Sequence, residues 1–239
     1  MKPLSLILFV LLFPAAYPAC RQALLARNTS SSNDTSTVNK LLELCISNYR
    51  KNPDRAYKLA GESYNISKEI NYTKGIAKSL YIMGISKKYL GQFDSSIYFI
   101  KKTLETYLQN GDRAGLASCY SVLGDLYIKK TNYLRAIANY DSARTIFTEI
   151  NDSSNISKIY NAIGNMYFSQ KQYEKALYFH NQSLEINKFL KFNLGISVNY
   201  NNIGNIYKKT GNYPKAIEYY DKALAIKKSI GDSIGLAIA

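Results

Sequence analysis

The side chains that could serve as nucleophile, general base or metal ligand are few and far apart. The chain of 239 residues has one His, His180, and three Cys. Cys45 and Cys119 stand alone, without a Cys-x-x-Cys spacing or a second His that could activate a thiol. The carboxylates are scattered singly, and residues 111–115 fit a turn rather than a phosphate-binding loop. We therefore predict that the protein is not an enzyme and has no catalytic residues, metal or cofactor.

These isolated residues are better explained as parts of an interior. His180 occupies the position that Tyr140 and Tyr220 fill forty residues before and after it, so we interpret it as a substituted core aromatic. Cys45 and Cys119 are interpreted as buried thiols. Function must then depend on a binding surface, and that surface depends on the elements that carry it.

Composition indicates a folded, basic chain. Hydrophobic residues make up 46% and charged residues 20%, which excludes a wholly disordered chain. Lys and Arg total 31 against 17 Asp and Glu, giving a net charge of +14. Because the lysines are spread along the whole chain, we expect a solvated basic surface and no nucleic-acid partner.

The first residues are typical of an export signal. Residues 4–13 form an apolar run that ends at Pro14. This run is too short to span ~30 Å of hydrocarbon as a helix, which takes about 20 residues. We expect residues 1–19 to be a signal peptide and the protein to be exported to the periplasm or cell envelope.

Cys20 leaves two alternatives open. Residues 17–20 loosely resemble the lipobox of bacterial lipoproteins, so Cys20 is a candidate lipidation site that would anchor the protein to a membrane. In the other alternative the signal peptide is simply cleaved. Residues 20–37, which are rich in Ser, Thr and Asn, are expected to form a polar tether.

Two sets of glycines with one period organise the rest of the chain. The first set is Gly84, Gly124, Gly164 and Gly204, spaced at forty residues. The second reads Gly75, Gly115, Asn155, Gly195 and Gly235. Each period has room for two helices of roughly 16 residues and two short turns. Capping residues recur at the same boundaries, at Asn52, Gln92, Asn132, Gln172 and Asn212 for second helices and at Asp112 and Asp152 for first helices.

The glycines of the first set also predict how the helices pack. Without a Cβ, each lets the second helix of a unit approach the first closely. An aromatic ring nine positions later is expected to fill the space alongside, at Phe93, Tyr133, Tyr173 and Tyr213.

This pattern resembles the tetratricopeptide repeat family. The resemblance is clearest in Tyr200-Asn201-Asn202-Ile203-Gly204-Asn205-Ile206-Tyr207 and Gly211-Asn212-Tyr213-Pro214-Lys215-Ala216-Ile217. The period of forty rather than about 34 residues is similar to the longer repeats of bacterial exported proteins and of the sensing regions of bacterial histidine kinases. The resemblance implies an all-α fold, a right-handed α-solenoid of stacked antiparallel helix hairpins. Its units would be 38–72 (degenerate), 73–112, 113–152, 153–192, 193–232 and a truncated sixth, 233–239.

The resemblance also implies a binding groove. In this fold the first helix of each hairpin lines the concave surface, so residues three before and one after each first-set glycine should project there. These residues are Tyr81, Ile85, Ser121, Asp125, Asn161, Asn165, Asn201 and Asn205, flanked by Lys78, Lys88, Lys158, Lys208 and Phe168. The four asparagines form a ladder whose amides could pair with the backbone of an extended peptide. The Lys/Asn clamp of chaperone-binding relatives is not reproduced, because Tyr81 and Ile85 stand at its positions.

We therefore predict a non-catalytic protein–protein interaction scaffold of the bacterial cell envelope. It would bind a peptide or protein segment in its groove and take no small-molecule substrate. The alternative is the extracytoplasmic sensing region of a larger signal-transduction protein, a histidine kinase or a transcriptional regulator.

Overall fold

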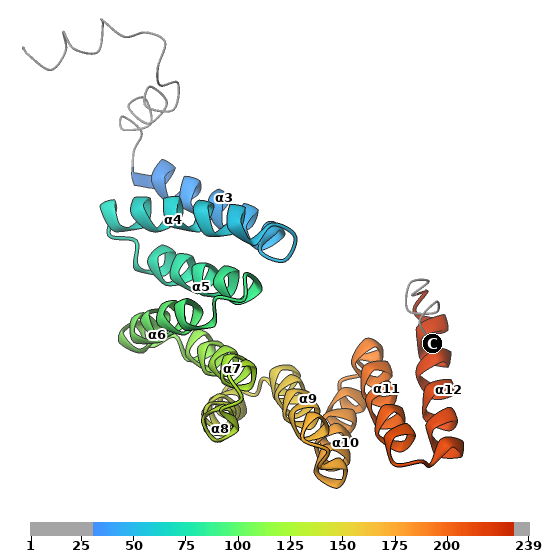
Figure 1. The fold of residues 1–239 in the computed structure, drawn as a ribbon. Helices are drawn as coiled ribbons and strands as arrows, with labels where there is room; N and C mark the ends of the chain where they lie inside the picture. Colours follow the sequence, from blue (N-terminus) through green and yellow to red (C-terminus); the bar gives the residue numbers. More distant parts are fainter. Residues whose placement is uncertain (1–30, 232–239) are drawn as a thin grey trace, which may run out of the picture. The chain divides into compact units, whose positions relative to one another are not determined.

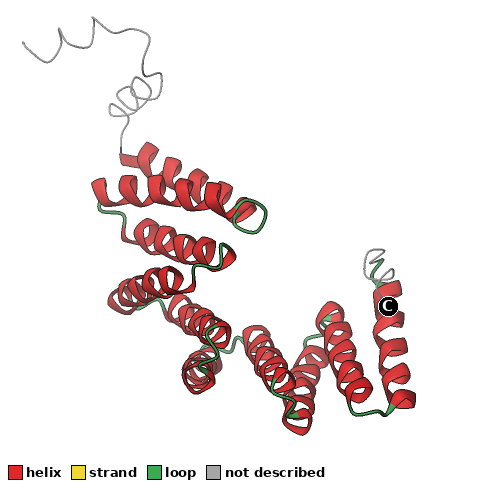
Figure 2. Cartoon of the chain, in the orientation of Figure 1, coloured by secondary structure: helices red, strands yellow, loops and turns green. Residues whose placement is uncertain are grey.

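The computed structural model describes residues 31–231, and within this range it contains ten helices and no strand (Figure 1 and Figure 2). The helices are α3 (Ser31–Asn48), α4 (Pro53–Glu69), α5 (Thr73–Tyr89), α6 (Phe93–Asn110), α7 (Arg113–Lys129), α8 (Tyr133–Glu149), α9 (Ser153–Ser169), α10 (Tyr173–Phe189), α11 (Asn193–Lys209) and α12 (Tyr213–Ser229). The predicted all-α class is confirmed. The predicted signal peptide 1–19, Cys20 and the truncated unit 233–239 lie outside the described residues.

The helices follow the forty-residue period. Four first helices begin at Thr73, Arg113, Ser153 and Asn193. The expected tether is wrong over residues 31–37, because α3 begins at Ser31. Exposed Ser, Thr and Asn cost a helix less than about 0.7 kcal/mol each relative to Ala. The buried stripe of Val38, Leu42 and Cys45 can therefore hold a helix that continues upstream through polar residues.

The chain divides after Ile82 into two compact units. In the first, α3 packs on α4. The Cys45 thiol donates to the carbonyl oxygen of Ala56 at 3.6 Å, and both residues are fully buried. Ser79 Oγ donates to Ser63 Oγ at 2.8 Å, so the interior of this unit is partly polar.

The second unit is a stack of three complete hairpins preceded by α6. Each hairpin packs internally, α7 on α8, α9 on α10 and α11 on α12. Successive elements are joined by contacts of α6 with α7, α8 with α9, and α10 with α11. The first helices also touch one another, α7 with α9 and α9 with α11. The first helices therefore form a shared face within this unit.

The first-set glycines are required by close approach, as predicted, but the residue that fills each notch differs from the prediction. A Cβ added to Gly124 would lie 2.6 Å from the Tyr140 ring, and one added to Gly164 would lie 2.8 Å from the His180 ring. The partner is thus sixteen positions on rather than nine. The aromatic residues nine positions after each glycine are the first residues of the second helices. Their rings are half-buried or exposed, and Tyr213 is 62% exposed. Sixteen residues take the chain around the turn to the level of the glycine.

The turns are closed by the predicted caps. Asn52, Asn132 and Asn212 accept the backbone N–H three residues later at 3.1–3.2 Å, whereas Gln92 and Gln172 make no such bond. The side chain of Asp112 accepts from Gly115 N at 2.8 Å, and that of Asp152 from Asn155 N at 3.0 Å. At α11 the capping position holds Phe192, which supplies no side-chain acceptor.

Candidate functional site

The predicted groove residues from Ser121 onward lie on the first helices α7, α9 and α11, and all are half-buried or exposed. These first helices contact one another, α7 with α9 and α9 with α11. Lys78 and Tyr81 belong to the first unit, whereas Ile85 and Lys88 of α5 and all later groove residues belong to the second. The hydrogen bonds of the predicted residues separate those that hold the fold from those that are open to a partner.

Asp125 is occupied by the protein itself. The Tyr140 hydroxyl donates to Asp125 Oδ1 at 2.7 Å, and the Lys88 ammonium forms an ion pair with Asp125 Oδ2. Burial, together with the charge of Asp125, raises the pKa of Tyr140 well above its usual range, so the hydroxyl stays a donor. Both carboxylate oxygens of Asp125 therefore already have partners within the chain, and its contact with a binding partner stays a prediction.

Asn205 occupies the equivalent position in α11 and has the equivalent partner. Tyr220, sixteen residues after Gly204, donates its hydroxyl to Asn205 Oδ1 at 2.8 Å. In α9 this pairing is missing, because His180 replaces the tyrosine and no hydrogen bond joins it to Asn165. Asn165 is exposed, and its side-chain amide makes no hydrogen bond within the described chain.

His180 is an interior residue, as predicted. It is 1% exposed, and its Nδ1 has no hydrogen-bond partner. Burial lowers the pKa of the imidazole to about 4, so the ring is neutral at physiological pH. This histidine belongs to the packing of the α9–α10 hairpin.

The asparagine ladder is only partly free. Asn202 Nδ2 donates to Asn161 Oδ1 at 2.9 Å, a bond that ties α11 to α9. Asn161 therefore holds neighbouring repeats together, and Asn205 is held by Tyr220. The remaining pair, Asn165 and Asn201, makes no side-chain hydrogen bond within the described chain. The ladder thus offers two open amides rather than four.

The other predicted residues differ in how open they are to a partner. Lys208 is exposed near the end of α11, and Ser121 is half-buried in α7. Phe168 packs against Tyr173 of its own hairpin, with ring centroids 5.9 Å apart, so it is only partly available as a platform. Lys158 Nζ donates to Asn155 Oδ1 at 3.0 Å.

A pocket next to this face was not predicted. It has a volume of about 220 Å³ and lies among α9, α10 and α11. Its lining consists of Ser157, Lys158, Asn161, Ser183, Asn187, Phe192, Leu194, Gly195, Val198 and Asn199. The sequence carries the signal for it, because Asn187 stands where the two preceding repeats have Tyr107 and Phe147. A shorter side chain at this position leaves the space open.

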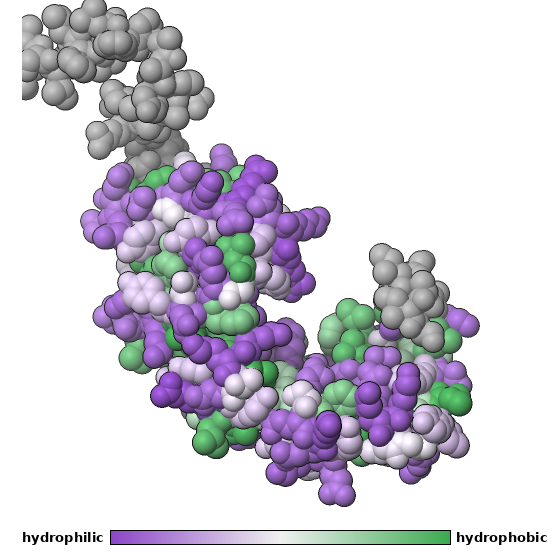
Figure 3. Space-filling view, in the orientation of Figure 1, coloured by the Kyte–Doolittle hydropathy of each residue, from purple (hydrophilic) through white to green (hydrophobic). Residues whose placement is uncertain are grey.

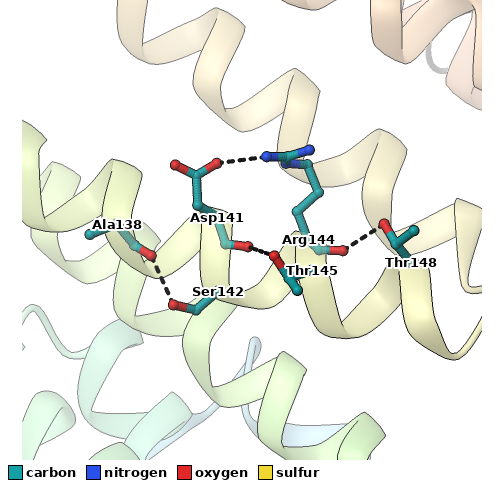
Figure 4. Close-up of polar contacts among 6 residues, drawn as sticks. All are labelled: Ala138, Asp141, Ser142, Arg144, Thr145 and Thr148. Atoms are coloured by element: carbon teal, nitrogen blue, oxygen red, sulfur yellow. Dashed lines mark hydrogen bonds and ion pairs between the residues drawn. The ribbon is translucent and has the colours of Figure 1, made fainter.

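The second helices present a different surface. On α8, hydroxyl groups donate back to carbonyl oxygens of the same helix, one turn earlier (Figure 4). Arg144 pairs with Asp141 on that helix at 3.2 Å. Figure 4 draws the residues that make these contacts, Ala138, Asp141, Ser142, Arg144, Thr145 and Thr148. The hydroxyl groups bond within α8, and Arg144 interacts with Asp141 of α8 and with Tyr160 of α9, so this surface is less suited to a partner than the first-helix face.

Reactive chemistry is not assembled among residues 31–231. Burial raises the pKa of the Cys45 thiol to about 11 and that of Cys119 to about 12, so both stay protonated. Within that range no group of three His, Cys, Asp or Glu side chains is placed to hold a metal ion. The helices of this range include none that is both long and apolar enough to cross a membrane.

The comparisons with known proteins agree with this architecture. Residues 115–188 and 155–229 match the tetratricopeptide repeat family, so the repeats of residues 115–229 belong to that family. No curated protein matches the chain.

Solved structures with low sequence identity share the fold. Aspartyl phosphate phosphatase F from Bacillus subtilis matches with a TM-score of 0.78 and 19% identity, covering 89% of this chain and 56% of that one. BtubC from P. vanneervenii matches with a TM-score of 0.63 and 16% identity, covering 85% and 93%. The quorum sensor NprR from B. thuringiensis matches with a TM-score of 0.67 and 16% identity, covering 87% and 58%. These matches establish the helical repeat fold that the sequence predicted.

Proposed function

We propose that this protein is a non-catalytic scaffold that binds an extended segment of a partner protein along α9 and α11. The observation that carries the proposal is the pair of open amides on these adjoining helices, Asn165 and Asn201. Each offers a donor and an acceptor, the two groups that an extended backbone presents. Tetratricopeptide repeats hold such a surface ready before the partner arrives, so little ordering entropy is lost on binding.

Charge supports a partner that is neutral or acidic. The chain has a net charge of +14, and Lys208 is exposed at the end of the same face. Long-range attraction would speed the encounter with an acidic segment and would weaken as salt is added. The amides then contribute pairing that does not depend on the sequence of the segment.

Photo-crosslinking can locate the partner. A photo-crosslinking amino acid at position 165 or 201 should give adducts in cells, and one at position 142 on α8 should not. The captured protein is then tested with the double variant Asn165→Ala/Asn201→Ala. We expect at least a tenfold loss of affinity with an unchanged melting temperature, because neither amide contributes a hydrogen bond to the fold. Equal binding by the double variant and the native protein would contradict the proposal.

We also propose that the scaffold acts in the cell envelope, anchored through Cys20. The support is the sequence of residues 1–20, which lies outside the described residues. Cys20→Ser should release the protein from the membrane fraction, and retention of the variant there would count against lipidation. If the protein is instead the sensing region of a larger signalling protein, the reading frame beyond Ala239 should encode an apolar span and an output domain.

A further inference from the structure

The turn between α10 and α11 carries an apolar patch. Its five side chains are exposed by 39–83%: Phe189, Leu190, Phe192, Leu194 and Val198. At the same positions the preceding repeat has Glu149, Ile150, Asp152, Ser154 and Lys158, so four of the five are polar there. Apolar surface is visible in Figure 3 where α10 passes into α11. A cluster of this kind on an otherwise polar turn is typical of a contact surface.

A capping carboxylate is missing at the same turn. In the two preceding repeats an aspartate of the chain itself caps the first helix, Asp112 on Gly115 N and Asp152 on Asn155 N. At α11 Phe192 holds that position and makes no side-chain cap. Gly195, whose N–H the equivalent aspartate would bind, is one of the residues that line the pocket. The positive end of the α11 dipole adds to the attraction for a negative group.

A second, independent feature of the pocket also calls for a ligand. Asn187 and Asn199 line it and are only 4% and 1% exposed. Asn187 Nδ2 donates to Asn199 Oδ1 at 2.7 Å, which leaves Asn187 Oδ1 and Asn199 Nδ2 without partners. Turning both amides around would again leave one acceptor and one donor. A buried unpaired donor and acceptor are costly. Both atoms are closed to solvent here, so a peptide amide would pair with them as the two side chains turn toward the pocket.

The charge of the pocket lining indicates which kind of ligand fits. Lys158 is the one charged residue in the lining, and the lining contains no Asp or Glu. A single lysine within a mostly apolar rim suits one carboxylate beside apolar side chains. A nucleic acid would need several cations along a polar track.

We propose that the α10–α11 junction binds a partner peptide that carries an Asp or Glu flanked by apolar residues. The carboxylate takes the place that Asp112 and Asp152 fill in the preceding repeats and accepts from the Gly195 N–H and the Lys158 ammonium. A backbone amide of the peptide pairs with Asn187 and Asn199, and its apolar side chains cover Phe192 and its neighbours. This inference rests on the proposed function only in that the partner is a polypeptide, and it does not use Asn165 or Asn201.

The test uses a blocked pentapeptide, acetyl-Ala-Leu-Asp-Leu-Ala-amide, whose only charge is the aspartate. It is titrated into the full chain while the Gly195 amide resonance is followed by NMR. We expect saturable shifts of this resonance, and at least tenfold weaker binding of the peptide in which Asn replaces Asp. No shift, or equal binding of the two peptides, would overturn the proposal.

Two variants with the same charge change separate the site from general electrostatics. Phe192→Asp gives α11 its own cap and should lower affinity for the pentapeptide at least tenfold. Gln172→Asp gives α10 a cap away from the pocket and should leave affinity unchanged. A thermal melt of each confirms folding. Equal affinity in the two variants would overturn the assignment of the carboxylate to the α11 terminus.

The groove variant separates the two proposals. Asn165→Ala/Asn201→Ala should bind the pentapeptide as the native protein does, because neither residue lines the pocket. If it loses the pentapeptide, the peptide occupies the first-helix face and the junction proposal fails. If it keeps both the pentapeptide and the crosslinked partner, the groove proposal fails and the junction proposal stands.

Discussion

The α8–α9 and α10–α11 junctions occupy equivalent places in successive repeats but are filled in opposite ways. At the first, Phe147 and Ile159 are 2% and 1% exposed and pack as an apolar core. At the second, the same positions hold Asn187 and Asn199, equally buried and joined by one hydrogen bond. The comparison teaches that the repeat fixes the backbone and the space between helices, while the chemistry within that space can change.

The polar junction is a local weakness of the fold. Unpaired amide groups at Asn187 and Asn199 cost on the order of 1–3 kcal/mol each when they stay buried. The shorter side chain at position 187 also lines a pocket between α10 and α11. A chain that needed only stability would keep the apolar pair, and this argues for a binding role at the polar one.

The largest expected effect comes from making the apolar junction polar. Phe147→Asn removes a buried ring and places an amide among apolar neighbours, so we expect a loss of about 3–5 kcal/mol in the free energy of unfolding. Urea denaturation at pH 7 measures it. Phe147→Leu is the control and should lose less, since it keeps an apolar side chain. A loss below about 1 kcal/mol for Phe147→Asn would show that the junction tolerates a polar filling without need of a function.

The next effect depends on pH and concerns His180. Its folded-state pKa of about 4 lies below the ordinary value of 6.5, so the unfolded chain binds a proton that the folded chain does not. The stability contributed by the neutral ring is therefore complete above pH 6.5 and is lost as the pH falls toward 4. At pH 4.5 this amounts to about 2–3 kcal/mol, from about 1.36 kcal/mol per pKa unit.

His180→Tyr should remove this acid sensitivity. The tyrosine matches Tyr140 and Tyr220, and its hydroxyl can donate to Asn165 as theirs donate to Asp125 and Asn205. Urea unfolding at pH 7 and pH 4.5 is compared for the two proteins. We expect the native protein to lose about 2–3 kcal/mol more than the variant over this range. Parallel losses would show that His180 titrates normally in the folded chain.

The repeat architecture was predictable because each helix boundary is encoded locally and recurs. Gly124 and Gly164 repeat at one spacing, and Asn132 or Asp152 caps the helix that the period requires. The start of α3 was not predictable in this way, because the buried stripe that holds it begins only at Val38. The helical turns before Val38 are polar, and their local sequence is typical of a flexible tether.

For the binding site, the sequence predicted which helix face carries it but not which side chains on that face are free to bind. Position on a first helix decides which side chains can reach the face, but hydrogen bonds decide which of them are free. Asp125 is lost to Tyr140 and Lys88, and Asn161 to Asn202, through contacts between residues that are distant in the sequence. Replacement of a tyrosine by His180 frees Asn165, which a comparison of the repeats position by position would have shown.

Converting the polar junction into the apolar one should have a smaller effect of opposite sign. Asn187→Phe combined with Asn199→Ile copies Phe147 and Ile159. A ring beside Gly195 has a precedent, because Tyr107 lies against Gly115. We expect the free energy of unfolding to rise by about 1–2 kcal/mol, since both buried amides are removed together. Urea unfolding measures it, and destabilisation would show that the backbone at this junction is adapted to the amides.

The smallest expected effect compares the caps of the two junctions. Asp152→Ala removes the bond to Asn155 N and should cost about 1 kcal/mol, because that N–H then has no side-chain acceptor. Phe192→Ala removes no cap from α11 and should change stability by less than about 0.5 kcal/mol, as expected for a half-exposed side chain. Thermal and urea unfolding of the two variants measure the difference. If Phe192→Ala costs as much as Asp152→Ala, the ring stabilises the turn through packing, and the two junctions are closed equally well by different means.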